Sequence, residues 1–582
     1  MDPATNTDPS RSSVRRPRAP AARGGDLPLM DRPVGHAGWR QHAVPAILLG
    51  LLVLLSTGAT LRNGFVYDDV FIVRENPSVQ RLLEPWQYFS QSYWYATACC
   101  SMYRPLTVWL LALQWQIGDG APWVFHAGNL LLYLGLTFAV YAVARRQLGA
   151  AGGWAAAALF AVHPVHVEVT GNVVGQAELT MSLASVVAAL WYLRMRSAGD
   201  PGARDLVVLG TLTLAACSAK EEGLVLPGLL AALELTLVRD PRPWRERLAA
   251  LRPLALALTL AIVAILAARF SVLGGLGAGP TSVAFTGLDA GGRTSTMFAI
   301  VPEWFRLLLW PAHLSADYSP PAFGQPGSFD ARHAAGVLLL VLSAGVAWWS
   351  RHRAPVVTSG ILWAAIAMLP MSNVFLPTGI VLAERTLLLP SVGAVLAAGA
   401  AFEVLFRNAV GGRAGRVAVV TALVGVLAAG TLRSASRQVV WRENRAFFEQ
   451  MQRDAPGGYR SYSVYGAYLA AEGSLAEAAD QYRRAASLYH DDPRMSEEYA
   501  QVLRRTGRCA EAIPILEQAL AIDRMRPVAR TRLFLCLLAA GEADSARSVA
   551  REGTALGLRT FEALEARADS ALARGADRRG QP

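Results

Sequence analysis

The segment "AVPAILLGLLVLLSTGATL" at residues 43–61 contains no charged residue. It is long enough to cross a lipid bilayer, which takes roughly 20 residues. Similar apolar segments recur as far as residue 432, and charged residues make up only 17% of the chain, against roughly 25% in typical soluble proteins. The sequence therefore predicts an all-α, polytopic membrane protein.

Arginines gather at the ends of the apolar segments, and the positive-inside rule uses such residues to orient spans. Counting outward from the basic N-terminus predicts about eleven spans. They lie near residues 43–61, 122–144, from 154, 177–193, from 206, 223–238, 251–268, 332–349, 355–371, 386–406 and 417–432. This count places residues 62–121 in a large external loop and leaves the C-terminal tail outside.

The turns predicted to be internal are rich in arginine, whereas the external turns carry acids, histidines or cations. The external motifs are "YDD", "YRP", "HPVHVE", "GQAE", "AKEE", "SADYS" and "AER". Ionisable groups near a membrane are costly and usually functional. Unrelated solvated loop charges would explain polar loops but not this sidedness, so we expect one site on the external face.

The domain organisation follows from composition. Residues 1–42 are rich in arginine and proline and predict a disordered basic cytoplasmic tail. We expect a transmembrane catalytic domain over 43–441 and a repeat domain over 442–580. The net charge is +11, but the arginines that produce it gather at the ends of the apolar segments. Nucleic-acid binding is therefore not expected.

A repeat occupies the C-terminal tail. "GSLAEAADQYRRA", "GRCAEAIPILEQA" and "GEADSARSVAREG" align so that Ala478, Ala512 and Ala546 are spaced 34 residues apart. This period, with two helices in each unit, is typical of tetratricopeptide (TPR) repeats, which stack into an α-solenoid. Such arrays bind peptide or protein segments along a concave face.

The order of these motifs resembles that of the transmembrane-and-TPR-containing protein O-mannosyltransferases, members of glycosyltransferase superfamily C (GT-C). The motifs are "GFVYDD" (64–69), "YRPLT" (103–107), "HAGNLLLY" (126–133), "FAVHPVHVEVTGNVVGQAEL" (160–179), "KEEG" (220–223), "LSADYS" (314–319) and "AERTLLLPSVG" (383–393). The resemblance covers roughly residues 43–555. It implies a GT-C-type bundle that transfers a sugar, mannose in the best-known members, from a polyprenyl-phosphate or dolichyl-phosphate donor to Ser or Thr hydroxyls of exported proteins. "GQAEL" departs from the family's usual pattern.

The external residues suit this chemistry. An alcohol is a poor nucleophile, so a carboxylate acting as general base helps. Asp68 and Asp69 directly follow the first span, and we favour Asp69 slightly as the base. The alternative for both residues is a solvated loop or a helix cap.

The leaving lipid phosphate needs cations, and the external candidates are Arg104, Lys220 and Arg385. Lys220 is the only lysine in a chain with 55 basic residues. A lysine acts on phosphate as a point charge, whereas an arginine binds through a bidentate fork. The alternative for Lys220 is a buried pair with a glutamate.

The remaining polar residues of this face are candidates for contacts with the sugar or the acceptor: Tyr103, His163, His166, Glu168, Glu178, Glu221 and Glu222. His163, His166 and Glu168 also have possible metal-ligand spacing, but hydrogen bonding is the commoner use of such histidines. We therefore predict no metal ligands and identify no certain cofactor, with a divalent cation as the alternative.

The prediction is an inverting protein O-glycosyltransferase whose TPR domain captures the acceptor polypeptide. Its partners would be the lipid-linked donor, the acceptor and membrane lipids. Alternatives are a lipid-linked glycan ligase or polymerase, and a non-catalytic membrane-tethered TPR scaffold. The arginine and alanine bias suggests a bacterial inner membrane with the external face periplasmic. In a eukaryote that face would be the endoplasmic reticulum lumen.

Overall fold

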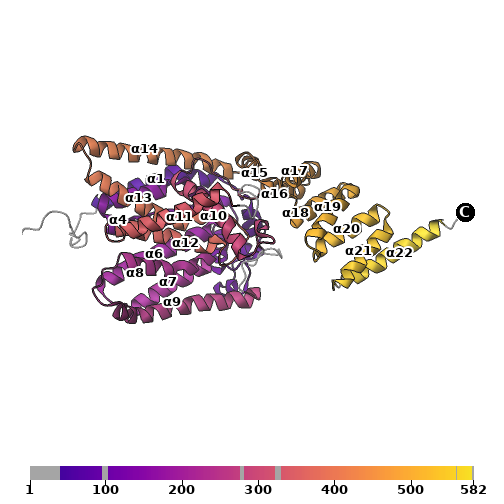
Figure 1. Cartoon of the computed structure of the whole chain (residues 1–582), viewed down its shortest axis with the longest axis horizontal. Helices are drawn as coiled ribbons and strands as arrows, with labels where there is room; N and C mark the ends of the chain where they lie inside the picture. The colour runs from indigo at the N-terminus through magenta and orange to yellow at the C-terminus, as the bar shows by residue number, and fades with distance from the viewer. Residues whose placement is uncertain (1–39, 95–101, 276–280, 321–328, 559, 580–582) are drawn as a thin grey trace, which may run out of the picture. The chain divides into compact units, whose positions relative to one another are not determined.

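The computed structural model describes residues 40–94, 102–275, 281–320, 329–558 and 560–579 (Figure 1). These residues form helices and turns and contain no β-strand, as the apolar pattern predicted. Residues 1–39 of the predicted basic tail lie outside the described residues.

The first fourteen α-helices belong to the apolar part of the chain. They are α1 (Arg40–Thr57), α2 (Pro77–Gln80), α3 (Pro105–Gly118), α4 (Pro122–Ala161), α5 (Val167–Gly171), α6 (Gln176–Ala198), α7 (Ala203–Ala219), α8 (Leu226–Thr236), α9 (Trp244–Leu273), α10 (Ala290–Leu309), α11 (Ala331–Ser350), α12 (Pro355–Met368), α13 (Leu388–Arg407) and α14 (Arg413–Gln438).

Helix α4 reverses direction at Gly149, whose backbone is non-helical at φ +84° and ψ −169°. The hydroxyl of Tyr133 donates to the carbonyl of Phe160 at 2.7 Å, across 27 residues. A straight helix would separate these residues by about 40 Å. The element is therefore a hairpin of two helices, at the two places where the sequence predicts the second and third spans.

Eight helical stretches of the described chain are long and apolar enough to cross a membrane. They are Ala43–Arg62, Pro122–Ala161, Val173–Ala198, Trp244–Leu273, Ala331–Ser350, Pro355–Ser372, Glu384–Arg407 and Arg413–Trp441. At the predicted fifth and sixth spans the structure has the shorter helices α7 and α8, of 17 and 11 residues. The chain is a multi-pass membrane protein, and eleven spans stays a prediction.

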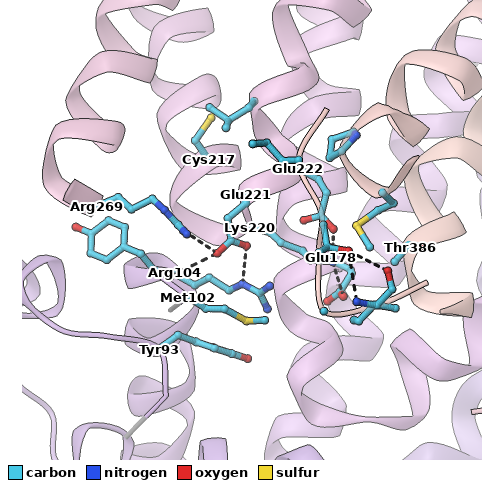
Figure 2. A pocket seen from close by; sticks show the side chains of 18 of the residues that line it. Tyr93, Met102, Arg104, Glu178, Cys217, Lys220, Glu221, Glu222, Arg269 and Thr386 are labelled. Carbon is cyan, nitrogen blue, oxygen red and sulfur yellow. Dashed lines mark hydrogen bonds and ion pairs between the residues drawn. The ribbon is translucent and has the colours of Figure 1, made fainter. Parts of the chain in front are cut away.

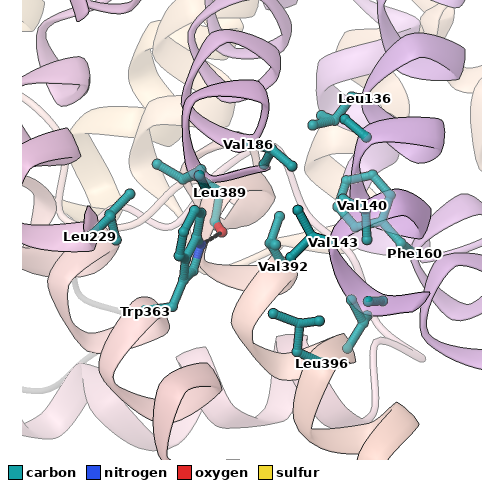
Figure 3. Close-up of a cluster of buried hydrophobic side chains, with 14 of the residues drawn as sticks. Leu136, Val140, Val143, Phe160, Val186, Leu229, Trp363, Leu389, Val392 and Leu396 are labelled. Atoms are coloured by element: carbon teal, nitrogen blue, oxygen red, sulfur yellow. Dashed lines mark hydrogen bonds between the residues drawn. The ribbon is translucent and has the colours of Figure 1, made fainter. Parts of the chain in front are cut away.

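A large apolar core packs the bundle helices together (Figure 3), and smaller apolar clusters lie beside it. Val140 of α4, Val186 of α6 and Val392 of α13 are fully or almost fully buried within it. Trp363 of α12 donates its indole N–H to the Leu389 carbonyl at 2.9 Å, so its polar atom is satisfied inside the core. This core fixes the helix ends from which the site residues project.

Eight further helices make up the C-terminal region. They are α15 (Asn444–Asp454), α16 (Tyr459–Ala471), α17 (Leu475–Leu488), α18 (Pro493–Arg505), α19 (Cys509–Ile522), α20 (Pro527–Ala539), α21 (Ala543–Ala555) and α22 (Phe561–Arg579). The pairs α16–α17, α18–α19 and α20–α21 are the three predicted repeats. Ala478, Ala512 and Ala546 are each fully buried, as the shared small position of the repeat requires. Pro514 lies inside α19, which continues past it.

Candidate active site

A cavity of about 440 Å³ lies where helix ends and loops of the bundle meet (Figure 2). Its charged lining comes from six segments that are far apart in the chain. The eight residues are Asp68, Arg104, Glu178, Lys220, Glu221, Glu222, Arg269 and Arg385. The structure thus brings together seven of the predicted site residues, along with Tyr103, at one end of the bundle.

One wall of the cavity is apolar. Ile265 and Leu266 of α9 form part of it, together with Leu369, Phe375 and Leu376 from the segment after α12. Phe375 is 72% and Leu376 64% exposed. Exposed apolar side chains of this size beside a polar cavity are typical of a binding surface for an apolar partner.

Lys220 lies between two glutamates. Its Nζ is 2.7 Å from Oε1 of Glu178 and 2.7 Å from Oε1 of Glu222. The lysine lies between α7 and the short 3₁₀ helix η6 (Glu221–Val225), and only 4% of its surface is exposed. The buried Lys–Glu pair that the sequence left open is present, and Lys220 lines the cavity as well.

Glu221 connects two arginines of the cavity. Arg104, the residue before α3, approaches it at 3.0 Å, and Arg269, near the end of α9, at 3.2 Å. Although burial favours the neutral acid, the arginines hold the pKa of Glu221 below its usual value. Arg104 also stacks over the ring of Tyr93, 4.9 Å from the centroid. Figure 2 shows Arg104 and Arg269 converging on Glu221.

Arg385 is the cation nearest to Asp68. It lies in the 3₁₀ helix η9 (Glu384–Leu387), with one guanidinium nitrogen 3.5 Å from both Asp68 and Glu168 and another 3.7 Å from Glu178. Its backbone N–H donates to Glu168 at 2.9 Å. Glu168 therefore holds Arg385 in place from behind the cavity, and burial raises the pKa of that carboxyl.

The two adjacent aspartates have different surroundings. Asp68 lines the cavity. Asp69 is fully buried, and its carboxylate accepts the backbone N–H groups of Val66 at 3.3 Å, Val173 at 3.1 Å and Val174 at 2.9 Å. Burial raises the pKa of Asp69 to about 7 in spite of these bonds. Asp69 thus ties the loop to the segment before α6, an arrangement that argues against the predicted preference for it as the base.

The two histidines lie outside the cavity lining. His163 contacts the Leu308 carbonyl through Nε2 at 3.0 Å and accepts the Val165 N–H. His166 is buried, with Nδ1 2.9 Å from the Tyr133 hydroxyl and Nε2 2.9 Å from the Ser391 hydroxyl. Burial lowers the pKa of both rings. Both histidines therefore join helices, and neither has a ring nitrogen directed at the cavity.

Tyr103 lines the cavity, but its hydroxyl already donates its proton to the Phe89 carbonyl at 2.7 Å. Glu222 offers a better contact, because its Oε2 is buried without a hydrogen-bond partner. Within the described part of the chain, no three His, Cys, Asp or Glu side chains are grouped to hold a metal ion.

Arg269 was missed from the sequence. It was available, because it stands at the predicted outer end of the seventh span (251–268), on the same face as the other candidates. By sequence alone it is indistinguishable from the arginines that flank the other spans. What separates it from them is its burial and its contact with Glu221, which depend on the packing of α9 against α7.

The helices, the charged cavity and the repeats define a class: a polytopic membrane protein with one polar site at the bundle end and a helical-repeat tail. Two protein families match parts of the chain. The family described as dolichyl-phosphate-mannose-protein mannosyltransferase matches residues 103–267, which include Arg104, Glu178, Lys220, Glu221 and Glu222. The tetratricopeptide repeat family matches residues 503–569.

Curated proteins match longer parts of the chain. The chain is 26% identical over 530 residues to the protein O-mannosyl-transferase Tmtc3 of Drosophila melanogaster, covering 79% of this chain and 56% of that protein. It is 34% identical over 313 residues to the protein O-mannosyl-transferase Tmtc2 of the same organism, covering 50% of this chain and 32% of that protein. It is 24% identical over 493 residues to the human protein O-mannosyl-transferase TMTC4, covering 75% of this chain and 65% of that protein. The resemblance inferred from the motifs is confirmed, and the chain spans about a third to two thirds of these relatives' length.

Proposed function

We propose that this protein is a GT-C-type membrane glycosyltransferase that transfers mannose from a polyprenyl-phosphate-mannose or dolichyl-phosphate-mannose donor to Ser or Thr hydroxyls of proteins. The observation that carries the proposal is the cavity, in which Asp68 lies 3.5 Å from Arg385 beside three further cations and an apolar wall. The family match over residues 103–267 and the O-mannosyl-transferase relatives support the same reaction and donor.

Asp68 is proposed as the general base, in place of Asp69. Its carboxylate would take the proton of the acceptor hydroxyl as that oxygen attacks the anomeric carbon. The bond from this carbon to the donor phosphate breaks in the same step, and the lipid phosphate leaves. A single displacement of this kind inverts the configuration at the anomeric carbon.

The leaving phosphate develops negative charge, which fixed cations stabilise. We propose Arg104, Arg269, Lys220 and Arg385 for this role. Each of these cations contacts a carboxylate in the structure. The phosphate must therefore compete with those carboxylates. Glu221 is the most exposed of these carboxylates, with 31% of its side chain accessible, and its movement would free Arg104 and Arg269 for the phosphate.

The remaining contacts follow from position. The unpartnered Oε2 of Glu222 would accept a sugar hydroxyl, because a buried acceptor without a donor is costly. The apolar wall formed by Ile265, Leu266, Phe375 and Leu376 would cover the first isoprene units of the donor. A divalent cation near the carboxylates stays possible as a further aid, and no residue is assigned to it.

The domain limits and the membrane side belong to this proposal. We place the catalytic bundle at 43–441 and the repeat domain at 442–580, with the cavity and the repeats on the extracytoplasmic face. That face would be periplasmic in a bacterium and lumenal in the endoplasmic reticulum. The repeats would bind the acceptor polypeptide.

The test uses the full-length protein in liposomes with polyprenyl-phosphate-mannose and a pool of exported proteins. Mass spectrometry measures hexose on Ser and Thr. Asp68→Asn should lower the transfer rate by about 10²- to 10⁴-fold, the usual contribution of a general base. Glu75→Gln is the matched control, because Glu75 lies in the same loop and its side chain is 53% exposed.

Asp69→Asn separates the two aspartates. Its amide group would face backbone N–H donors, so we expect a lower Tm and a smaller loss of transfer than with Asp68→Asn. Loss of transfer only with Asp69→Asn would contradict the assignment. A non-catalytic scaffold predicts no hexose with wild type, and a glycan ligase predicts product on lipid-linked glycan instead of protein.

A further inference from the structure

Tyr67, the residue immediately before Asp68, has a left-handed backbone with φ +58°. An aromatic residue rarely adopts this conformation, because its Cβ crowds the backbone. Such a conformation persists only where the surroundings hold it, and it is concentrated at functional sites. The groups that hold Tyr67 are therefore of interest for the direction in which Asp68 points.

Asn444, the first residue of α15, holds the backbone of this loop. Its Oδ1 accepts the Tyr67 N–H at 2.8 Å, and its Nδ2 donates to the Phe65 carbonyl at 3.4 Å. One side chain thus bonds the backbone on both sides of Val66. The nearby bond from the Gly64 N–H to the Arg442 carbonyl, at 3.0 Å, extends the same attachment.

The side chain of Tyr67 is held by the same region. Its ring centroid lies 5.6 Å from that of Phe447 and 6.1 Å from that of Phe448. Arg460, in α16, donates to the Tyr67 hydroxyl at 3.3 Å. Val66 belongs to the apolar cluster that runs through the repeat helices, so the loop packs against α15 and contacts the start of α16.

A second loop is attached at the same place. Asp317, from the segment between α10 and α11, accepts the Ser461 N–H at 2.9 Å, and Ser319 accepts the Arg460 N–H at 3.3 Å. The N-terminus of α16 is therefore anchored to the bundle next to its contact with Tyr67. This anchor makes the start of the repeat region a fixed support for the loop.

We propose that Asn444 and Arg460 are positioning residues, which hold Tyr67 in its left-handed conformation and thereby aim Asp68 into the cavity. Asp69 fixes the other side of Asp68 through its bonds to Val66, Val173 and Val174. The start of the repeat region is then a structural part of the active site. The role of Asp68 as the base rests on the proposed function. The part of Asn444 and Arg460 in holding the loop does not depend on it.

The test combines two measurements on the full-length protein in detergent or liposomes. Hydrogen–deuterium exchange of the peptide containing residues 64–69 reports the loop, and mannose transfer reports the base. Asn444→Ala removes both backbone bonds, whereas Asn444→Asp keeps the acceptor for the Tyr67 N–H. Gln452→Ala is the matched control, because Gln452 lies on α15 and bonds Gln481 at 2.7 Å, with no contact to the loop.

Asn444→Ala should speed exchange of the 64–69 peptide by at least tenfold and lower kcat by a similar factor, with the KM for the donor unchanged. Asn444→Asp should keep the exchange rate and kcat close to those of wild type. Gln452→Ala should change neither the exchange rate nor kcat. Tyr67→Phe removes only the contact with Arg460, and serves as a milder variant should Asn444→Ala fold poorly.

Unchanged exchange in Asn444→Ala would overturn the positioning role whatever the activity. Faster exchange with unchanged kcat would overturn the link from the loop to the base. If wild type transfers no hexose while exchange responds as expected, the proposed function fails and the positioning role of Asn444 stands.

Discussion

Lys220 is held by two carboxylates, each 2.7 Å from its ammonium nitrogen. An ammonium is a compact point charge that fits between two acids, whereas a guanidinium is wide and planar. In a chain whose other basic residues are arginine, this geometry is a physical reason for a lysine at position 220. Lys220 also lines the cavity, where the proposed function assigns it to the donor phosphate.

Lys220→Arg is expected to lower both Tm and mannose transfer. The larger side chain must displace Glu178 or Glu222 in a packed site, and overpacking costs about 1–3 kcal/mol. Thermal unfolding in detergent and the transfer assay measure the two effects, with at least a tenfold drop expected in transfer. Arg74→Lys is the control, since the Arg74 side chain is 52% exposed. Full transfer by Lys220→Arg would show that the site does not need a compact ammonium in place of a guanidinium at position 220.

At the scale of elements, glycines decide how closely the helices pack. A Cβ added at Gly360 in α12 would lie 2.4 Å from the Gly393 carbonyl oxygen in α13. Within lipid, where helix association depends on close packing, small residues at such interfaces allow the backbones to approach. Helix α13 continues from η9, which carries Arg385, so this contact also sets the position of one site residue.

Gly360→Ala should therefore separate α12 from α13 and lower the Tm by several degrees, the scale expected for about 1–3 kcal/mol. Gly425→Ala is the matched control, because nothing lies within 4 Å of a Cβ at that position of α14. Thermal unfolding of both variants gives the comparison. An equal Tm for the two variants would mean that the helices adjust to the added methyl group without cost.

At the scale of the whole molecule, the side of the membrane is the property on which the function depends. The contact of Tyr67 with Asn444 and Phe447 places the loop after α1 and the start of the repeats at the same end of the bundle. The same end carries the cavity. The arginine-rich turn at residues 351–353 lies between α11 and α12, where the span count predicts the cytoplasmic side.

Cysteine labelling tests this arrangement. In a cysteine-free background, Arg74→Cys and His490→Cys should react with a membrane-impermeant maleimide added from outside. Arg351→Cys should react only after the membrane is permeabilised. The cysteine-free parent is the control. Labelling of residues 74 and 490 from opposite sides would contradict the shared face.

The sequence predicted the helical class, the repeats and the composition of the site, because these depend on local patterns. Long apolar segments predict membrane spans, and a 34-residue period predicts TPR repeats. The ends of the spans limit where polar residues can lie. Seven of the eight charged residues in the cavity were predicted for this reason. Arg269 was missed because a buried arginine and a span-flanking arginine are identical in sequence.

The tertiary structure decided which of these residues face the cavity. Asp68 and Asp69 are adjacent and chemically equal. The backbone N–H groups of Val173 and Val174, far away in the chain, bind the carboxylate of Asp69, whereas Asp68 lines the cavity. His163 and His166 likewise have partners on other helices. Roles of this kind are set by contacts between distant segments, which no local pattern encodes, whereas the membrane fold follows from the hydropathy of each segment by itself.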